Sequence, residues 1–383
     1  MEKPKIRFLK NKHSWVRNTF EEIAKRRTKS SDNPDLPRIE YQDIISGEGR
    51  LNKDLNKNID SRKGIFFETN DILYGKLRPY LKNWLHPNFN GIALGDFWVF
   101  QARNCDSKFL FSLVQSPKFQ RVANDTSGTK MPRSDWKTVS QTEFSIPTSN
   151  EEQSAIGSLF CTLDDLLASY KDNLANYQSL KATMLSKMFP KAGQTVPEIR
   201  LDGFEDGWEE KEFSKLVKRV TQSSDSNSLP KVEFEDIISG QGRLNKDISN
   251  KFDNRKGIHF EPGYTLYGKL RPYLNNWLLP KFEGVALGDF WVFDPNGNDS
   301  NFIYYLIQSN RYQKVANDTS GTKMPRSDWK SVSSTIFAIP QTVAEQQAIG
   351  AYFSNLDNLI AAHQEKISQL ETLKKKLLQD IFI

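Results

Sequence analysis

Basic, aromatic and hydroxyl side chains that suit contacts with a polyanion occur twice in the 383-residue chain. They lie in three short stretches of the first half, and each stretch recurs 193 positions later, as 255 − 62 = 193 shows. Arg and Lys side chains combined with Thr and Tyr donors suit phosphate oxygens and the edges of guanine bases. The candidate DNA-binding residues are Arg62, Lys63, Lys76, Arg78, Tyr80, Thr129, Lys130, Arg133, Arg255, Lys256, Lys269, Arg271, Tyr273, Thr322, Lys323 and Arg326.

One of these stretches is a loop whose sequence is identical in both halves. Residues 122–136 and residues 315–329 both have the sequence VANDTSGTKMPRSDW. A loop that only faces solvent would drift in sequence after a duplication, so its identity favours a function. A recent duplication is the alternative, because the apolar positions of the two halves are also nearly identical. In that case the basic residues only solubilise the protein.

Groups for acid–base catalysis or metal binding are not duplicated in this way. Each of the 4 histidines and 2 cysteines has a different residue type at the equivalent position of the other half. We therefore expect no histidine base, no metal cluster and no disulfide. The equivalent pairs are His13 with Asp206, His86 with Leu279, His259 with Phe66, His363 with Tyr170, Cys105 with Asn298 and Cys161 with Ser354.

Two further motifs do not indicate enzymatic chemistry. The stretch TSGTK at residues 126–130 lacks the earlier glycine and the Ser or Thr after the lysine that a phosphate-binding loop needs, so nucleotide hydrolysis is not predicted. Asp96 and Asp289 are duplicated within LGDFWVF, among hydrophobic residues. A buried, hydrogen-bonded Asp that fixes the end of a strand is favoured there over an acid–base role.

The elements that must position the candidate residues include two long helices. Apolar residues alternate in steps of four and three along residues 149–190 and again along residues 342–383, which predicts a heptad seam for a partner helix. Each seam misses one position, at Lys181 and at Lys374. Ser149 with Glu152 and Thr342 with Glu345 have the spacing of a capping box, which predicts the helix starts.

The remainder of each half is predicted to be a mixed α/β globule of about 150 residues. Strands are expected after residue 41, over residues 64–68, 71–77 and 91–101, and over residues 139–146. A helix broken near Pro117 is expected over residues 108–122. We therefore predict four segments: a globular domain at 1–148, a long helix at 149–190, a linker and second domain at 191–341, and a long helix at 342–383.

The simplest packing of this duplicated chain is an α/β (α+β) arrangement of two near-identical domains with pseudo-twofold symmetry. The two long helices would form an antiparallel coiled coil that joins the domains. A parallel arrangement of the helices stays an alternative at this point. The net charge of +6 and the pI near 9.0 suit a polyanionic partner. The absence of an apolar run near the start or of membrane-span length predicts a cytoplasmic protein.

These features together resemble the specificity subunit of type I restriction-modification enzymes. The matching features are the Pro-x-Ile-Arg…Trp pattern of residues 4–15 and 197–208, the tandem domains, and the Glu-Gln…Ile…Phe…Leu-Asp pattern of residues 152–164 and 345–357. The ending LKKKLLQDIF at residues 373–382 also fits. The resemblance covers essentially the whole chain, but the two domains of family members are commonly dissimilar, whereas here they are near copies.

The resemblance implies a subunit without catalysis of its own. Each target-recognition domain would bind one half of a split double-stranded DNA sequence, and the helices would serve as a ruler and as the docking surface for two methyltransferase subunits. Those subunits, and not this chain, would bind S-adenosylmethionine. A restriction subunit with translocase and nuclease activity can join them. Because the two domains are near copies, the expected target is an interrupted palindrome.

Two other functions are compatible with parts of the sequence. One is a self-contained DNA methyltransferase or nuclease, although no catalytic cluster is duplicated. The other is a coiled-coil scaffold that does not bind DNA, in which the paired helices are the whole function.

Overall fold

The computed structural model of the chain describes residues 4–7, 14–52, 61–125, 130–251, 254–319 and 323–382. The chain divides into two compact units. Unit 1 consists of Met1–Asp172 with Gln364–Ile383, and unit 2 consists of Asn173–His363. Each long helix contributes residues to both units, so the four segment boundaries predicted from the sequence stay predictions.

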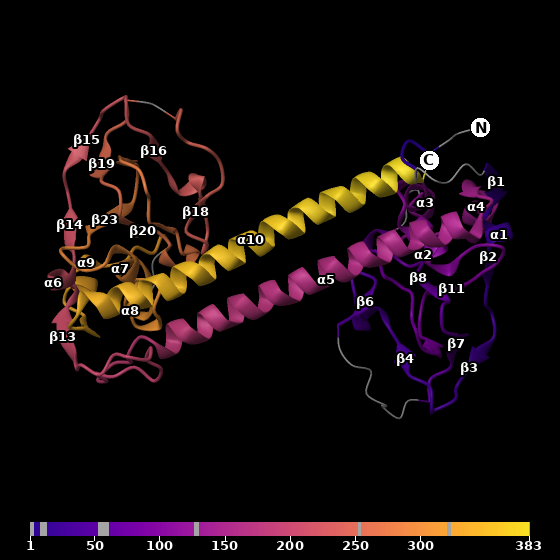
Figure 1. Cartoon of the computed structure of the whole chain (residues 1–383), viewed down its shortest axis with the longest axis horizontal. Coiled ribbons are helices and arrows are strands. Elements are labelled where there is room, and N and C mark those ends of the chain that lie inside the picture. The colour runs from indigo at the N-terminus through magenta and orange to yellow at the C-terminus, as the bar shows by residue number, and fades with distance from the viewer. Residues whose placement is uncertain are drawn as a thin grey trace. The chain divides into compact units, whose positions relative to one another are not determined.

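The first half of the chain forms short strands and helices and then one long helix (Figure 1). Their bounds are β1 (Trp15–Thr19), α1 (Phe20–Ile23), β2 (Ala24–Arg26), β3 (Ser30–Ser31), β4 (Arg38–Ile39), η1 (Tyr41–Asp43), β5 (Ile44–Ile45), β6 (Arg50–Leu51), β7 (Gly64–Phe67), β8 (Ile72–Gly75), η2 (Pro79–Leu81), β9 (Trp84–Leu85), β10 (Gly91–Ala93), β11 (Phe97–Ala102), α2 (Ser107–Gln115), α3 (Pro117–Ala123), α4 (Trp136–Gln141), β12 (Glu143–Pro147) and α5 (Asn150–Lys187).

The second half repeats this order of elements. Their bounds are β13 (Trp208–Glu212), α6 (Phe213–Leu216), β14 (Lys218–Val220), β15 (Ser223–Ser224), β16 (Lys231–Val232), η3 (Phe234–Asp236), β17 (Ile237–Ile238), β18 (Arg243–Leu244), β19 (Gly257–Phe260), β20 (Thr265–Gly268), η4 (Pro272–Leu274), β21 (Trp277–Leu278), β22 (Gly284–Ala286), β23 (Phe290–Asp294), α7 (Ser300–Leu306), α8 (Asn310–Ala316), α9 (Trp329–Ser333), β24 (Ile336–Pro340) and α10 (Val343–Ile381).

Two four-stranded sheets form the globular part of each unit. In unit 1 their strand orders are β3-β7-β10-β4 and β2-β11-β8-β9, and unit 2 has the equivalent orders β15-β19-β22-β16 and β14-β23-β20-β21. The strands are rich in aromatic and branched residues, which pack well on a pleated surface. In unit 1, one core cluster lies among residues of η1, β5, β7, β8 and β11, and a larger one includes α2, α3 and parts of α5 and α10.

The strand predicted over residues 91–101 is two strands in the structure. β10 pairs with β7 and β4, whereas β11 pairs with β8 and β2 in the other sheet. Gly95 between them has φ of +89°, a left-handed conformation that favours glycine and lets the chain change sheets. The single-strand prediction was therefore wrong at this point.

The strand predicted over residues 139–146 begins later than expected. The side chain of Asp135 accepts a hydrogen bond from the amide of Thr138 and starts α4, so the chain is helical through Gln141. β12 follows and pairs antiparallel with β1, with Ile146 opposite Val16. A one-turn helix carries too few residues to show the helical period in the sequence.

The two long helices contain 38 and 39 residues, as the heptad seams predict. In unit 1, Phe160 of α5 contacts Phe382, which directly follows α10, and Lys171 of α5 pairs with Glu371 of α10. In unit 2, Tyr177 of α5 contacts His363 of α10, whereas Phe189, which lies just after the end of α5, contacts Phe353. In each unit, rising residue numbers on α5 meet falling numbers on α10. The antiparallel arrangement is thus confirmed within each unit, and the parallel alternative is wrong there.

The starts of the two long helices differ from a capping box. The amide of Glu152 does donate to the hydroxyl of Ser149, at 3.3 Å. The fully buried carboxylate of Glu152, however, accepts two hydrogen bonds of 2.7 Å from Arg7 and one of 3.2 Å from the indole of Trp15. Glu345 makes the same contacts in unit 2, with Arg200 and Trp208. The glutamate therefore anchors a distant segment instead of closing a local box.

Helices that could cross a membrane are not found in the described part of the chain, because none there is both long and apolar enough.

Candidate nucleic-acid interface

A strained turn after β8 carries three of the candidate residues, Lys76, Arg78 and Tyr80. Arg78 has φ of +49° and Lys82 has φ of +54°, and between them lies the single turn η2, which Pro79 begins. Left-handed backbone at residues other than glycine costs free energy of order 1–3 kcal/mol and is concentrated at functional sites. The turn in unit 2 has the same form, with Arg271 at φ of +48°.

The strained turn is fastened to the loop that is identical in both halves. The amide of Arg78 donates to the carbonyl of Pro132 at 2.7 Å, and Leu77 forms an antiparallel bridge with Arg133. We call residues 76–82 with residues 130–133 the tip of unit 1, and residues 269–275 with residues 323–326 the tip of unit 2. The structure thus brings together candidate residues that lie about 50 positions apart in the sequence.

Large apolar side chains are exposed at each tip beside the basic ones. Tyr80 and Met131 are 56% and 48% exposed in unit 1, and Tyr273 and Met324 are 59% and 49% exposed in unit 2. Exposed aromatic and apolar groups next to arginine suit contacts with the faces and methyl groups of bases. We did not single out the two methionines from the sequence, although both lie in the identical loop.

A half-exposed carboxylate stabilises two of the cations in each tip. The Asp96 carboxylate lies 3.5 Å from the Lys76 ammonium and 3.0 Å from the Arg133 guanidinium. Its backbone carbonyl accepts a hydrogen bond of 2.6 Å from the hydroxyl of Tyr41, and burial raises the pKa of Tyr41 to about 12. The prediction of a buried Asp was wrong, because the side chain is 29% exposed and ion-paired.

The tip of unit 2 repeats this arrangement with one change. Asp289 lies 3.6 Å from Lys269 and 2.9 Å from Arg326. Phe234 occupies the position equivalent to Tyr41. Its ring packs on Phe290 as the Tyr41 ring packs on Phe97, but it lacks the hydroxyl that donates to the Asp96 carbonyl in unit 1. The cation geometry is nevertheless almost unchanged between the units.

Arg78 and Arg271 differ from the other arginines of the tips. Both are exposed, and within the described residues neither side chain has a hydrogen bond or an ion pair. Lys130 and Lys323 are also exposed. The candidates Thr129 and Thr322 lie outside the described residues.

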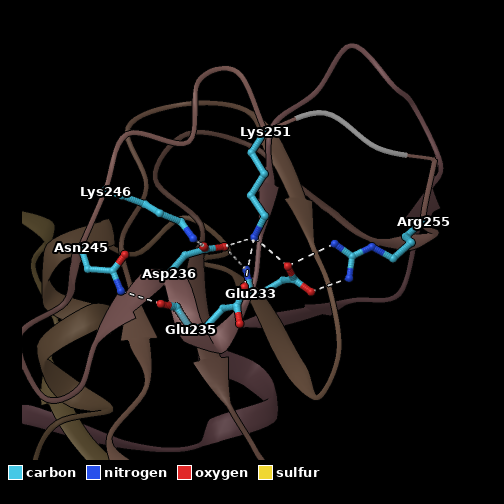
Figure 2. Close-up of polar contacts among 7 residues, drawn as sticks. All are labelled: Glu233, Glu235, Asp236, Asn245, Lys246, Lys251 and Arg255. Carbon is cyan, nitrogen blue, oxygen red and sulfur yellow. Dashed lines mark hydrogen bonds and ion pairs between the residues drawn. The ribbon is translucent and has the colours of Figure 1, made fainter.

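The candidates Arg62, Lys63, Arg255 and Lys256 precede β7 and β19, and each of the two arginines belongs to an ion-pair cluster other than the tip of its unit. Figure 2 shows this cluster in unit 2, where both ends of the Arg255 guanidinium reach Glu233, at 2.5 and 3.1 Å. Hydrogen bonds from Arg255 and then Lys251 hold the pKa of Glu233 below its ordinary value. Arg62 pairs with Glu40 at 2.7 Å in unit 1. These two arginines are therefore partly neutralised, whereas Lys63 and Lys256 are exposed.

Lys251 is the centre of the cluster in unit 2. Its ammonium lies 2.6 Å from Glu233 and 2.7 Å from Asp236, and Lys246 lies 2.9 Å from the other oxygen of Asp236 (Figure 2). These ion pairs fasten the segment before β19 to η3. Their arrangement is consistent with a role in ordering this segment.

One group of potential metal ligands occurs in the described part of the chain. His259, Glu261 and Glu283 place one ligand atom each within 4.8 Å of one another, and His259 lies 2.8 Å from Glu283. We did not expect this grouping from the sequence, because Phe66 occupies the position of His259 in unit 1. Both glutamates are exposed, and exposed acidic groups of this kind are common without a metal.

Part of this chain matches a family model, and the chain is similar to two curated proteins of the same kind. Residues 215–372 match the family model described as the type I restriction modification DNA specificity domain. The chain is 26% identical over 189 residues to the type I restriction enzyme EcoDI specificity subunit of Escherichia coli, which covers 47% of this chain and 42% of that protein. It is 21% identical over 299 residues to the MjaVIII specificity subunit of Methanocaldococcus jannaschii, covering 71% and 68%.

Solved structures show the same fold over nearly the whole length. The S subunit of a type I restriction-modification system from M. genitalium has a TM-score of 0.65 at 13% identity, with 100% of this chain and 99% of that chain covered. A chain from a study of complex assembly and conformational transition of the type I system has a TM-score of 0.52 at 18% identity, with 96% and 98% covered. The predicted resemblance and the predicted fold class are thus confirmed.

Proposed function

We propose that this chain, a relative of the type I specificity subunits, is the DNA-recognition subunit of a type I restriction-modification enzyme and has no catalytic activity of its own. The single observation that carries the proposal is the tip, which occurs in both units with the same exposed arginine, aromatic ring and ion-paired carboxylate. A pair of matching basic tips is the arrangement expected for reading a bipartite site.

The contacts divide the basic residues of each tip into two groups. Lys76 and Arg133 are already bound to Asp96, so they chiefly stiffen the tip and add positive potential near phosphates. Arg78 has an unpaired guanidinium on a rigid, strained turn. A free guanidinium of this kind can donate two hydrogen bonds to O6 and N7 of guanine. We assign base reading to Arg78 and Arg271, and phosphate contacts to Lys130 and Lys323.

The expected target is a bipartite sequence in which one half is the reverse complement of the other. The candidate DNA-binding residues are of the same type at equivalent positions of the two tips, so each tip should bind the same bases. A helix of 38 residues is about 57 Å long at 1.5 Å per residue, whereas half-sites one turn apart are separated by roughly 34–36 Å. The helices are thus long enough to act as a ruler and still offer surface to other subunits.

The partners follow from the same proposal. Two methyltransferase subunits would dock on this chain and supply S-adenosylmethionine, so the chain needs no cofactor of its own. A restriction subunit with translocase and nuclease activity can complete the enzyme. Because its substrate is cellular DNA, we place the complex in the cytoplasm.

Single-molecule methylation sequencing tests the proposal. Cells that express the chain with its methyltransferase partner are compared with cells that lack the chain. We expect a new methylated-adenine motif made of two inverted halves. A motif with two unrelated halves would keep the recognition role but refute the symmetric target. No new motif, with a partner shown to be active, would refute the recognition role and favour a scaffold. Methylation or cleavage by the purified chain alone would favour an enzyme.

A further inference from the structure

The position that each heptad seam misses is occupied by a lysine that joins three elements. In unit 1, the Lys374 ammonium of α10 lies 2.5 Å from the Asp164 carboxylate of α5. It also donates a hydrogen bond of 2.7 Å to the side-chain carbonyl of Gln115, at the end of α2 in the recognition domain. Lys374 and Asp164 are only 12% and 18% exposed. We call these three residues the clasp of unit 1.

Unit 2 contains the equivalent clasp. The Lys181 ammonium of α5 lies 2.6 Å from Asp357 of α10 and donates to Gln308 at 3.1 Å. The glutamines are held in turn, because their amide groups donate to the backbone carbonyls of Phe111 and Tyr304. In each unit, the lysine comes from the long helix of the opposite repeat. The clasp therefore forms only when both helices and the recognition domain are correctly placed.

Stability alone does not explain a charged pair in an apolar seam. Burial raises the pKa of Asp164, although Lys374 opposes this effect. The charged form is thus more costly in the folded chain than in water. Replacing a buried ion pair by apolar residues of similar size is often neutral or stabilising, whereas buried polar groups in coiled coils fix the arrangement of the helices.

Further polar contacts tie the recognition domain to the helices in each unit. In unit 1, Lys171 of α5 lies 3.1 Å from Glu48 of the domain and 2.8 Å from Glu371 of α10. In unit 2, Gln241 replaces Glu48. In unit 2, the Tyr305 hydroxyl of α7 donates a hydrogen bond of 2.8 Å to Asp357, so the clasp there has a further link to the domain.

We propose that Lys374 and Lys181 are positioning residues that fix the orientation of the recognition domain on the helix pair within their own units. This inference extends the proposed function, because domain orientation would then determine the spacer between the two half-sites. Neither lysine contacts DNA in this proposal. Loss of a clasp should widen the range of spacers that are methylated and leave the half-site sequences unchanged.

The first test measures orientation without DNA. Spin labels are placed on Thr69→Cys, in a loop of the recognition domain of unit 1, and on Lys376→Cys, an exposed position of α10. Cys105→Asn and Cys161→Ser remove the native thiols, with the residue types that unit 2 has at these positions. We expect one narrow distance distribution in the parent chain and a broader one after Lys374→Met with Asp164→Leu.

Two further variants control this measurement. Lys375→Met changes an exposed neighbour on the same helix, so its distribution should stay narrow. Asp164→Asn removes the charge of the carboxylate with almost no change in side-chain shape. If the double variant Lys374→Met with Asp164→Leu does not fold, Asp164→Asn is measured in its place. A distribution that stays narrow in every folded clasp variant would overturn the inference, whatever happens with DNA.

The second test is the spacer distribution from methylation sequencing. The double variant Lys374→Met with Asp164→Leu should methylate the parental spacer with a weaker preference over spacers that are one base pair longer or shorter. We expect this preference to fall by on the order of tenfold, which corresponds to about 1.4 kcal/mol. The equivalent pair in unit 2, Lys181→Met with Asp357→Leu, should have an effect of the same order. An unchanged spacer preference would overturn the link to DNA. If the parent chain directs no motif at all, the proposed function fails, whereas the orientation result still decides the positioning role.

Discussion

Arg78 and Arg271 are the residues on which sequence reading by this chain should depend most. Their guanidinium groups are exposed and unpaired within the described residues, while the strained φ angles and the hydrogen bonds from their amides to the carbonyls of Pro132 and Pro325 fix the backbone that carries them. A preorganised side chain loses less conformational entropy when it binds. For this reason, a rigid free arginine gives more sequence discrimination than a mobile one.

We expect Arg78→Ala with Arg271→Ala to remove sequence preference. Each arginine–guanine pair is worth about 1–3 kcal/mol of discrimination, so the ratio of target to non-target affinity should fall by on the order of tenfold or more per half. The measurement is a binding titration of the assembled complex at fixed salt concentration. Lys130→Ala with Lys323→Ala is the matched comparison. This variant should lower the affinity for target and non-target DNA by the same factor. The slope of log affinity against log salt concentration should fall in magnitude by about 1 for each phosphate that a lysine no longer neutralises. Equal losses of discrimination in both variants would contradict the assignment.

Glu152 is the residue on which the start of α5 depends. Its buried carboxylate is bound by Arg7 and Trp15, and the hydrogen bond that Arg7 donates to Glu152 is the main cause of the raised pKa of Arg7. We expect Glu152→Ala to destabilise the chain by about 3–5 kcal/mol, because the removal of one partner leaves buried donors unpaired. Glu152→Gln keeps an acceptor and should cost less. Urea unfolding measures both, and Glu345→Ala provides the same test in unit 2. A change below about 1 kcal/mol for Glu152→Ala would show that water replaces the carboxylate.

At the scale of elements, the sequence predicts what depends on local periodicity. The apolar seams predict α5 and α10 almost to their ends, because a helix presents the same face every three to four residues. The partner of Glu152 lies 145 residues away, and no local pattern indicates it. The lysines that interrupt the seams likewise appear in the sequence as missing apolar positions, although in the structure each forms a largely buried ion pair with an aspartate.

The tips show the same limit. Duplication singled out Arg78 and Lys130 as candidates, because the stretches that contain them are identical in both halves. The sequence could not show that the two stretches meet, since their contact depends on a left-handed arginine that carries no sequence signal. Asp96 was expected to be buried because its neighbours are apolar, yet it lies between β10 and β11, just before β11 begins, where its side chain is partly exposed.

The Lys374→Met variant should make the stability of the helix pair depend on pH. Without the ammonium, Asp164 stays among apolar groups, and its pKa, which burial already raises, should rise further. The folded chain then binds a proton more readily than the unfolded chain. The penalty is therefore fully present above the folded pKa and disappears as the pH falls towards the ordinary value of 3.8.

We expect a loss of about 3–5 kcal/mol at pH 7 and a smaller loss at pH 5 for this variant. Urea unfolding at the two pH values measures the difference. Lys374→Met combined with Asp164→Leu removes the titrating group and should show no such pH dependence relative to the parent chain. If the single variant were equally destabilised at both pH values, poorer packing and not the unpaired carboxylate would be the cause.

At the scale of the whole molecule, the internal repeat is the feature with the clearest consequence for the DNA target. Both units carry the same residues at the tip, apart from Lys82 in unit 1 and Asn275 in unit 2, which both adopt left-handed backbone. Two tips with the same base-reading residues should bind equal half-sites. The difference between Lys82 and Asn275 can change affinity for a phosphate, because only the lysine carries a charge.

A change in one tip alone should therefore break the symmetry of the target. With Arg271→Ala, we expect methylation sequencing to show one half-site unchanged and the other with several bases accepted at the position that the arginine contacts. Arg78→Ala should give the same set of methylated sequences as Arg271→Ala. The two variants should match because an inverted target looks the same when its halves are exchanged. If instead each variant relaxed a different base sequence, the two tips would bind unequal half-sites. Lys82→Asn, which makes the tips alike, would then show whether this one residue causes the inequality.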